Sequence, residues 1–161
     1  MIVRCVRTVH AEILANCPFS ISAEYASEYL KEAERGGEGA VLHAGPLGHR
    51  VTVRYGLRTD VTESGRSHDE ILLRWSAGSA WLPDFVGTLR IRIENANTRL
   101  VLDGSYAPPG GPLGKLFDAI AGRRIAIATA NDVLRRIARA LEERELLWRR
   151  GIEGVAGRKD T

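Results

Sequence analysis

The chain has 161 residues and a mass of 17.7 kDa, which is enough for one domain and too little for two of typical size. Hydrophobic residues make up 44% of it and charged residues 27%, a balance that excludes an intrinsically disordered chain. The net charge of +3 is the small difference between 23 basic and 20 acidic residues, so it permits an anionic partner without arguing for one.

The residues near the N-terminus carry no sign of a metal site, a disulfide framework or a targeting segment. Cys5 and Cys17 are the two cysteines, and no Cys or His residues stand around them at the spacing of metal ligands. Residues 1–10 alternate polar with apolar, unlike a signal peptide, and no stretch approaches the roughly 18 apolar residues of a membrane span. The sequence therefore predicts a cytoplasmic protein with no metal, no cofactor and no membrane span.

The first elements expected along the chain are a strand and a short helix. Apolar residues fall on every second position from Ala11 to Ile21, which predicts a half-buried strand over about residues 10–20. Ser22 is then expected to cap a helix that has Glu24 in its first turn and ends at the glycines of residues 36–39. The apolar stripe of this helix consists of Tyr25, Ala26, Tyr29, Leu30 and Ala33.

A series of hairpins follows, with turn residues between alternating runs. The strands are expected at residues 40–44, 50–58, 70–76, 85–94 and 98–106. Residues 60–67 are polar and predict a loop tip, and Asn95-Ala96-Asn97 predicts a tight turn. Consecutive hairpins imply an antiparallel sheet with one wet face, on which Asp103 can pair with Arg90 or Arg92.

The last third of the chain predicts a long helix. Prolines within residues 107–112 end the sheet because they lack a backbone donor, and a helical apolar pattern begins at Leu113. Gly122 predicts a kink or short break in it. The solvated side carries Arg135, Arg136, Arg139, Glu142 and Glu143, while apolar residues recur every seven positions at Ile120, Ile127, Leu134, Leu141 and Trp148. We expect one domain over residues 1–150 and a flexible tail over residues 151–161.

This order of elements resembles the START/Bet v 1-like (SRPBCC) superfamily, and its polyketide cyclase/dehydrase branch most of all. The resemblance spans roughly residues 10–145 and is carried by F-S-I-S-A-E-Y-A-S-E-Y-L (19–30) and by L-V-L-D-G-S-Y-A-P-P-G-G-P-L-G (100–114). The chain departs from the family pattern at one place: family members often have a proline where the first helix begins, whereas this chain has Ser20-Ile21-Ser22. The resemblance implies an α+β helix-grip fold, a curved antiparallel sheet wrapped around a long C-terminal helix. It also implies a hydrophobic cavity between sheet and helix that binds a lipid- or polyketide-like molecule.

The residues expected to line this cavity come from the apolar faces of the strands and of the helix. They are Val53, Tyr55, Leu73, Trp75, Trp81, Leu89, Ile91, Tyr106, Phe117, Ile120 and Ile127. The small side chains at Ala126, Ala128 and Ala130 leave room opposite the sheet. No residue is assigned a catalytic role, and a well-filled core is the competing interpretation of the same pattern.

Two other functions remain open at this stage. A cyclase/dehydrase-type enzyme would need a cavity Tyr, His or carboxylate as acid or base, and the expected inner face offers Tyr55 and Tyr106 but no Asp or Glu. A homodimer could form through the helix end at Leu146, Leu147 and Trp148. The histidines His10, His43, His49 and His68 are scattered and expected at the surface, and the interleaved acids of the last helix argue against nucleic-acid binding.

Overall fold

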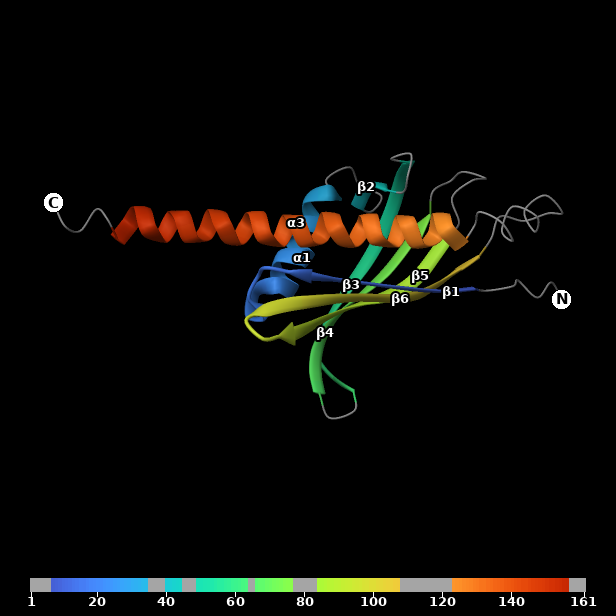
Figure 1. Ribbon diagram of the computed structural model, residues 1–161. Helices are drawn as coiled ribbons and strands as arrows, with labels where there is room; N and C mark the ends of the chain where they lie inside the picture. Colours follow the sequence, from blue (N-terminus) through green and yellow to red (C-terminus); the bar gives the residue numbers. More distant parts are fainter. Residues whose placement is uncertain are drawn as a thin grey trace.

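The computed structural model describes residues 7–34, 40–44, 49–63, 66–76, 84–107 and 123–156. In chain order the elements are β1 (Arg7–Ala15), α1 (Phe19–Ala33), β2 (Ala40–Ala44), β3 (His49–Glu63), β4 (Arg66–Ser76), β5 (Asp84–Glu94), β6 (Asn97–Ala107) and α3 (Arg123–Ala156). The strands form one six-stranded sheet in the order β1-β6-β5-β4-β3-β2, and every pairing is antiparallel. Figure 1 shows α3 crossing one face of this sheet, with α1 between α3 and the strands near one end.

The α+β class and the antiparallel sheet predicted from the alternating runs are confirmed. The alternating pattern predicted the strands because successive side chains of a strand point to opposite faces of the sheet, one packed against the core and one facing solvent. The turn before β6 is the tight one expected, since Glu94 pairs with Asn97 and Asn95 adopts a φ of 54°. Asparagine tolerates this left-handed conformation better than most residues.

The predicted boundary between the first strand and the first helix is wrong. β1 ends at Ala15 and α1 begins at Phe19, so the alternating residues after Ala15 belong to a turn and a helix. Pro18 decides this: with φ −58° and ψ 136° it stands at the N-cap and fixes the entry into the helix. Ser22 is consequently an internal helix residue, and no acidic residue lies in the first turn.

Pro18 also corrects the departure noted above from the superfamily pattern. A proline does precede the first helix of this chain, two positions before Ser20. The apolar stripe of α1 is as predicted, because Ala26 and Leu30 are buried, and Tyr25, Tyr29 and Ala33 pack against the core half-buried.

The polar segment of residues 60–67 is not a loop tip throughout. β3 continues to Glu63 and β4 begins at Arg66, with an irregularity in the pairing between Arg58 and Val61. The hairpin therefore projects well past the rest of the sheet (Figure 1). The pairing of the two strands continues through polar residues. Composition alone therefore ended β3 too early and began β4 too late.

The last helix ends later than expected. α3 runs from Arg123 to Ala156, so its final turns occupy part of the segment interpreted as a tail from residue 151. The helix start expected at Leu113 and the kink expected at Gly122 lie outside the described residues. Figure 1 shows the C-terminal half of α3 continuing past the edge of the sheet.

Candidate functional site

The inner face of the sheet, which α1 and α3 cover, is built from rows of paired residues. One row carries aromatic rings across three neighbouring strands: Trp75 on β4 pairs with Phe85 on β5, and Phe85 pairs with Tyr106 on β6. The rings of Trp75 and Phe85 stack with centroids 3.8 Å apart and planes 12° from parallel. All three residues are buried, so this row forms the aromatic wall of the inner face.

The adjacent row contains two paired glycines. Gly87 on β5 faces Gly104 on β6, and both lie next to the aromatic row. A Cβ placed on Gly87 would lie 2.5 Å from Cζ of Phe85, and one on Gly104 would meet the same ring. The Phe85 ring thus lies directly over the two glycines, and the Trp75 ring is stacked against it. Any larger residue at either position would push the ring away.

The helix α3 lies close to the edges of the sheet but not to its centre. Its Cα atoms come within 8 Å of those of β1, β6, β2 and α1, and within the described ranges they keep a greater distance from β3, β4 and β5. A helix packed directly on a sheet would approach the strands beneath it more closely, because packed layers are spaced about 10 Å apart and Cα atoms lie about 2 Å from the helix axis. Of the described backbone, α1 enters the region between α3 and the central strands, near one end of the sheet, and side chains occupy the rest.

The described candidates for the cavity lining share this inner region. Val53, Leu73, Trp75, Leu89, Ile91 and Tyr106 are all buried in the core cluster. Tyr55 and Ile127 are half-buried against the same cluster. Trp81, Phe117 and Ile120 lie outside the described residues. Of the small helix residues, Ala126 and Ala130 are buried and Ala128 is half-buried.

Tyr55 is a polar residue of the inner face with a hydrogen-bond partner. Its hydroxyl donates a hydrogen bond of 3.0 Å to Oε2 of Glu34, at the end of α1. Burial, and then the hydrogen bond and negative charge of Glu34, raise the pKa of Tyr55 above its ordinary value. Tyr55 therefore stays a neutral phenol at physiological pH and serves as a hydrogen-bond donor.

The sheet order, its antiparallel pairing and the long helix laid across its inner face now define the architecture. The fold is the helix-grip fold. The architecture implied by the resemblance to the START/Bet v 1-like superfamily is thereby confirmed from the topology of this chain.

Comparison with known proteins gives likeness in structure only. No family model matches the sequence, and no curated protein matches it. Solved structures with similar folds include Ara h 8.0201, at 11% identity and a TM-score of 0.49, with 88% of this chain and 98% of that chain covered. The protein TTHA0849 from Thermus thermophilus has 18% identity and a TM-score of 0.48, covering 88% and 98%. The ZhuI aromatase/cyclase from Streptomyces sp. R1128 has 17% identity and a TM-score of 0.46, covering 86% and 95%.

A cluster of hydrogen bonds holds the start of α1 against β6. Oγ1 of Thr98 donates a hydrogen bond of 2.7 Å to the carbonyl oxygen of Cys17 and lies 2.7 Å from Oγ of Ser22. Ser22 Oγ also donates to the carbonyl oxygen of Pro18 at 2.8 Å. Burial raises the pKa of the Cys17 thiol, so it is protonated and inert at neutral pH. This cluster holds structure rather than offering a reactive site.

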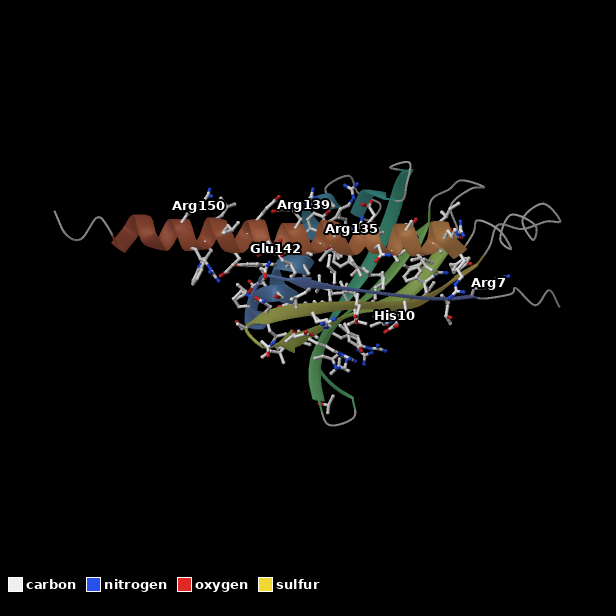
Figure 2. All side chains as sticks on the ribbon, viewed as in Figure 1. Arg7, His10, Arg135, Arg139, Glu142 and Arg150 are labelled. Carbon is white, nitrogen blue, oxygen red and sulfur yellow. The ribbon has the colours of Figure 1, made fainter. Side chains whose placement is uncertain are left out.

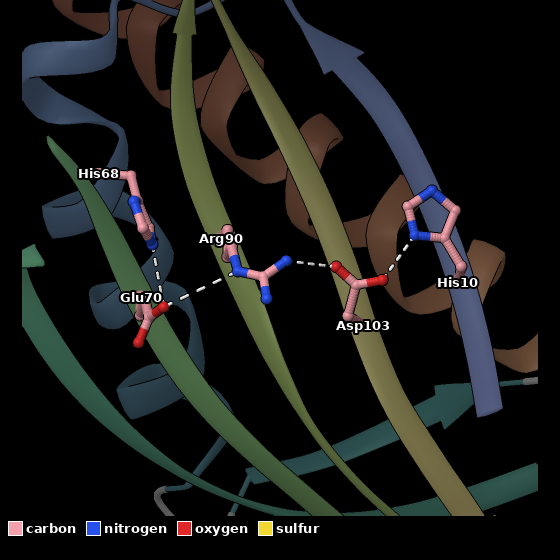
Figure 3. A network of polar contacts seen from close by, with 5 residues as sticks. All are labelled: His10, His68, Glu70, Arg90 and Asp103. Carbon is pink, nitrogen blue, oxygen red and sulfur yellow. Dashed lines mark hydrogen bonds and ion pairs between the residues drawn. The ribbon is translucent and has the colours of Figure 1, made fainter. Parts of the chain in front are cut away.

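The opposite face of the sheet carries a chain of charged groups that sequence reasoning only partly found. Figure 3 shows Arg90 donating to Asp103 at 2.5 Å, which confirms the expected cross-strand pair, and Asp103 contacting Nδ1 of His10 at 2.6 Å. On the other side, Glu70 lies 2.9 Å from Nε2 of His68 and 3.9 Å from Nε of Arg90. The two histidines whose side chains are described, His10 and His68, therefore lie on the outer face, away from α3.

His68 is not the surface residue that the sequence predicted. Only 2% of it is exposed, and its carboxylate partner Glu70 is also buried. The misplaced loop at residues 60–67 caused this error, because it put His68 at a loop end rather than inside a strand. His10 is exposed as expected, while the side chains of His43 and His49 lie outside the described residues.

One carboxylate on the inner face was missed. The alternation of β4 places Asp69 on the same face as Ile71 and Leu73, and Asp69 pairs across to Ile91. It is half-buried. The alternation that identified Ile71 and Leu73 could have found it, had β4 been extended past Glu70.

Metal-ligand clusters and membrane-spanning helices were considered for the described residues alone. Within the described ranges, no group of three or more His, Cys, Asp or Glu side chains is arranged to hold a metal ion. Among the same residues, none of the helices has the length and apolar character needed to cross a membrane.

Proposed function

We propose that this protein binds a small, largely apolar molecule between the inner face of the sheet and α3. The observation that carries the proposal is the position of α3, which approaches both edges of the sheet and stands off from β3, β4 and β5. Most of the described side chains on the inner face are apolar or aromatic, with Asp69 as a carboxylate among them. Burying apolar surface of a ligand against such a face contributes about 25 cal/mol per Å² to the free energy of binding.

In the conformation described, the aromatic and aliphatic side chains of the inner face cover one another. Leu73, Trp75 and Phe85 are each only 2% exposed. A ligand would therefore take its place by displacing a side chain. We propose that Phe85 is the one displaced, because Gly87 and Gly104 beneath its ring have no side chains to hold it on that side, and the contact with Trp75 is a stack of two rings. Turning the ring away would leave a flat apolar slot of about the size of one aromatic ring, beside Trp75.

Tyr55 would supply a polar contact to such a ligand. Its hydroxyl is at the edge of the apolar region and already donates to Glu34. A ligand with one acceptor and an otherwise apolar body would exchange with Glu34 for this donor.

A cyclase/dehydrase-type enzyme is the second candidate, and Asp69 is the observation that favours it. Asp69 is a half-buried carboxylate on the inner face, where sequence analysis expected none. The raised pKa of Tyr55 makes its phenolate scarce at neutral pH, so Tyr55 is a weak choice for a general base. The described histidines are on the other face. Among the described residues of the inner face, Asp69 is therefore the carboxylate that would serve as the acid or base of such a reaction.

The binding proposal is tested by filling the region from the helix side. Ala126 is buried on the inner side of α3, and Ala126→Leu adds the volume of three carbons there. In a filled core this over-packing costs about 1–3 kcal/mol in the free energy of unfolding. In a region able to admit a guest, we expect the variant to be nearly neutral in stability and to lose uptake of an apolar fluorescent naphthalene probe.

Two controls make the result specific. Native mass spectrometry of the freshly purified wild-type protein is expected to show a bound small molecule, which solvent extraction then identifies by class. Leu72→Trp adds bulk on the outer face, where Leu72 is exposed, and should leave probe uptake unchanged. A wild-type protein without guest or probe uptake, together with a strongly destabilised Ala126→Leu, would contradict the binding proposal.

A further inference from the structure

The second half of α3 carries large apolar side chains that are exposed. Leu134 and Leu141 occupy one stripe of the helix and are buried in the core. Trp148 lies seven residues further on the same stripe and is 56% exposed, and its neighbours Leu146 and Leu147 are exposed as well. Figure 1 shows that the C-terminal part of α3 extends past the end of the sheet. Exposed apolar residues in such a cluster indicate an interaction surface.

Four exposed residues form one face of this helix segment, which we call the distal face. Glu143, Leu146, Leu147 and Arg150 have the spacing i, i+3, i+4 and i+7, and all are exposed. They point away from the domain, because the helix period places them opposite the buried residues Leu141 and Glu145. In Figure 2 the labelled side chain of Arg150 projects from the side of α3 that faces away from the sheet.

The charges of the distal face are arranged symmetrically about its apolar centre. An acid, Glu143, stands at one end, a base, Arg150, stands at the other, and the two leucines lie between them. Within the part of the chain that is described, neither Glu143 nor Arg150 forms an ion pair in its own copy. The order acid, leucine, leucine, base is complementary to itself when the helix direction is reversed.

We propose that α3 docks, through the distal face, on the distal face of a second copy of this chain in antiparallel orientation. A twofold axis between Leu146 and Leu147 brings Leu146 of each copy against Leu147 of the other. The same axis sets Glu143 of each copy opposite Arg150 of the other, so the ion pair occurs twice. The interface is isologous, and its apolar centre with charged ends follows the usual anatomy of helix pairs in which flanking charges set the orientation.

A second copy fits this surface better than a nucleic acid or an unrelated protein does. A polyanion would meet Glu143 as well as Arg150, so half of the charged ends would repel it. An unrelated partner would need the same acid–base order in reverse, whereas a second copy supplies it without further requirement. The C-terminal part of α3 also extends past the end of the sheet (Figure 1), and all four residues of the distal face are exposed.

The first test is the molar mass in solution, measured by sedimentation or light scattering over increasing protein concentration. An interface of a few helical turns is small, so we expect reversible dimers that become prominent between about 10 µM and about 1 mM. Leu147→Asp should remove them. Ile93→Asp is the matched control, since Ile93 on β5 is 67% exposed, as Leu147 is, and lies outside the distal face. It should dimerise like the wild type.

The second test reverses the charges. Glu143→Arg sets like charges opposite each other twice, and Arg150→Glu does the same, so each should weaken dimerisation by about tenfold or more. The double variant Glu143→Arg/Arg150→Glu restores opposite charges and should dimerise again. Mixing the two single variants should give a mixed dimer, because one copy then offers only bases and the other only acids.

Several outcomes would overturn the proposal. A wild-type chain that remains monomeric at about 1 mM shows that the distal face does not bind its own kind. Loss of dimers in Ile93→Asp as well as Leu147→Asp would place the interface elsewhere. Dimers that survive both single charge reversals would exclude the antiparallel pairing. All these substitutions are at exposed positions, so circular dichroism should show an unchanged fold throughout.

Discussion

Phe85→Ala tests the aromatic wall and the two glycines beneath the Phe85 ring together. Phe85 is buried, and replacing a buried phenylalanine with alanine usually costs about 3–5 kcal/mol in the free energy of unfolding. The stack on Trp75 is lost as well, at about 0.5–1.5 kcal/mol. Gly87 and Gly104 have no side chains that could move into the space, so we expect a loss of about 4 kcal/mol. For a chain of this size, that corresponds to a melting temperature lower by roughly 8–16 °C.

The assay is urea unfolding followed by circular dichroism, with and without benzene. Benzene should occupy the vacated slot, and at about ten times its dissociation constant it should restore about 1.4 kcal/mol. Val86→Ala is the matched control, because Val86 is the next residue of β5 and is 51% exposed on the other face. It should change stability by less than about 0.5–1 kcal/mol. A loss below about 1.5 kcal/mol in Phe85→Ala, with no effect of benzene, would refute the reasoning.

Three further predictions concern the polar groups. Thr98→Val removes a buried hydroxyl that donates to the backbone of Cys17, so urea unfolding should show a loss of about 1–3 kcal/mol, and an unchanged midpoint would contradict this. Glu70→Ala leaves buried His68 without its partner and should cost about 2 kcal/mol, clearly more than Glu12→Ala on the exposed edge; equal losses would count against a buried pair. Burial raises the pKa of Tyr29, so its contribution to stability is complete below its unfolded value of 10.0 and is lost as pH rises through the folded value. Tyr29→Phe should therefore flatten the fall in urea midpoint above about pH 10, and an unaltered slope would disprove the assignment.

The element types were predictable because they depend on local periodicity. Apolar residues alternate with polar ones in β5 and β6, and apolar residues recur every seven positions through Leu134 and Leu141. Each pattern indicates one face of the element that must be buried. Element ends were less predictable. Pro18 begins the entry into α1, although apolar residues still alternate with polar ones after it. The pairing of β3 with β4 continues through polar residues that their composition had assigned to a loop.

The members of the inner face were found from the sequence wherever a strand was correctly bounded. Val53, Leu73, Leu89 and Ile91 follow from alternation alone, and all are buried. Asp69 was missed because the start of β4 was placed too late, and the burial of His68 was missed for the same reason. Phe85 was recognised as a strand residue but not as part of the site, because its role depends on pairing between strands.

The sequence by itself determined which residues are apolar, how they repeat and hence which elements form. Only the tertiary structure decided which residues meet across the sheet: that Gly87 faces Gly104 beneath the ring of Phe85, and that α3 stays close to the sheet edges. The physical reason is that periodicity fixes the side of an element that is buried, whereas register and the curvature of the sheet fix what lies against it. The distal face depends on both the sequence and the tertiary structure. The helix period places its four residues on one side of α3, and they are exposed because this part of α3 extends past the sheet.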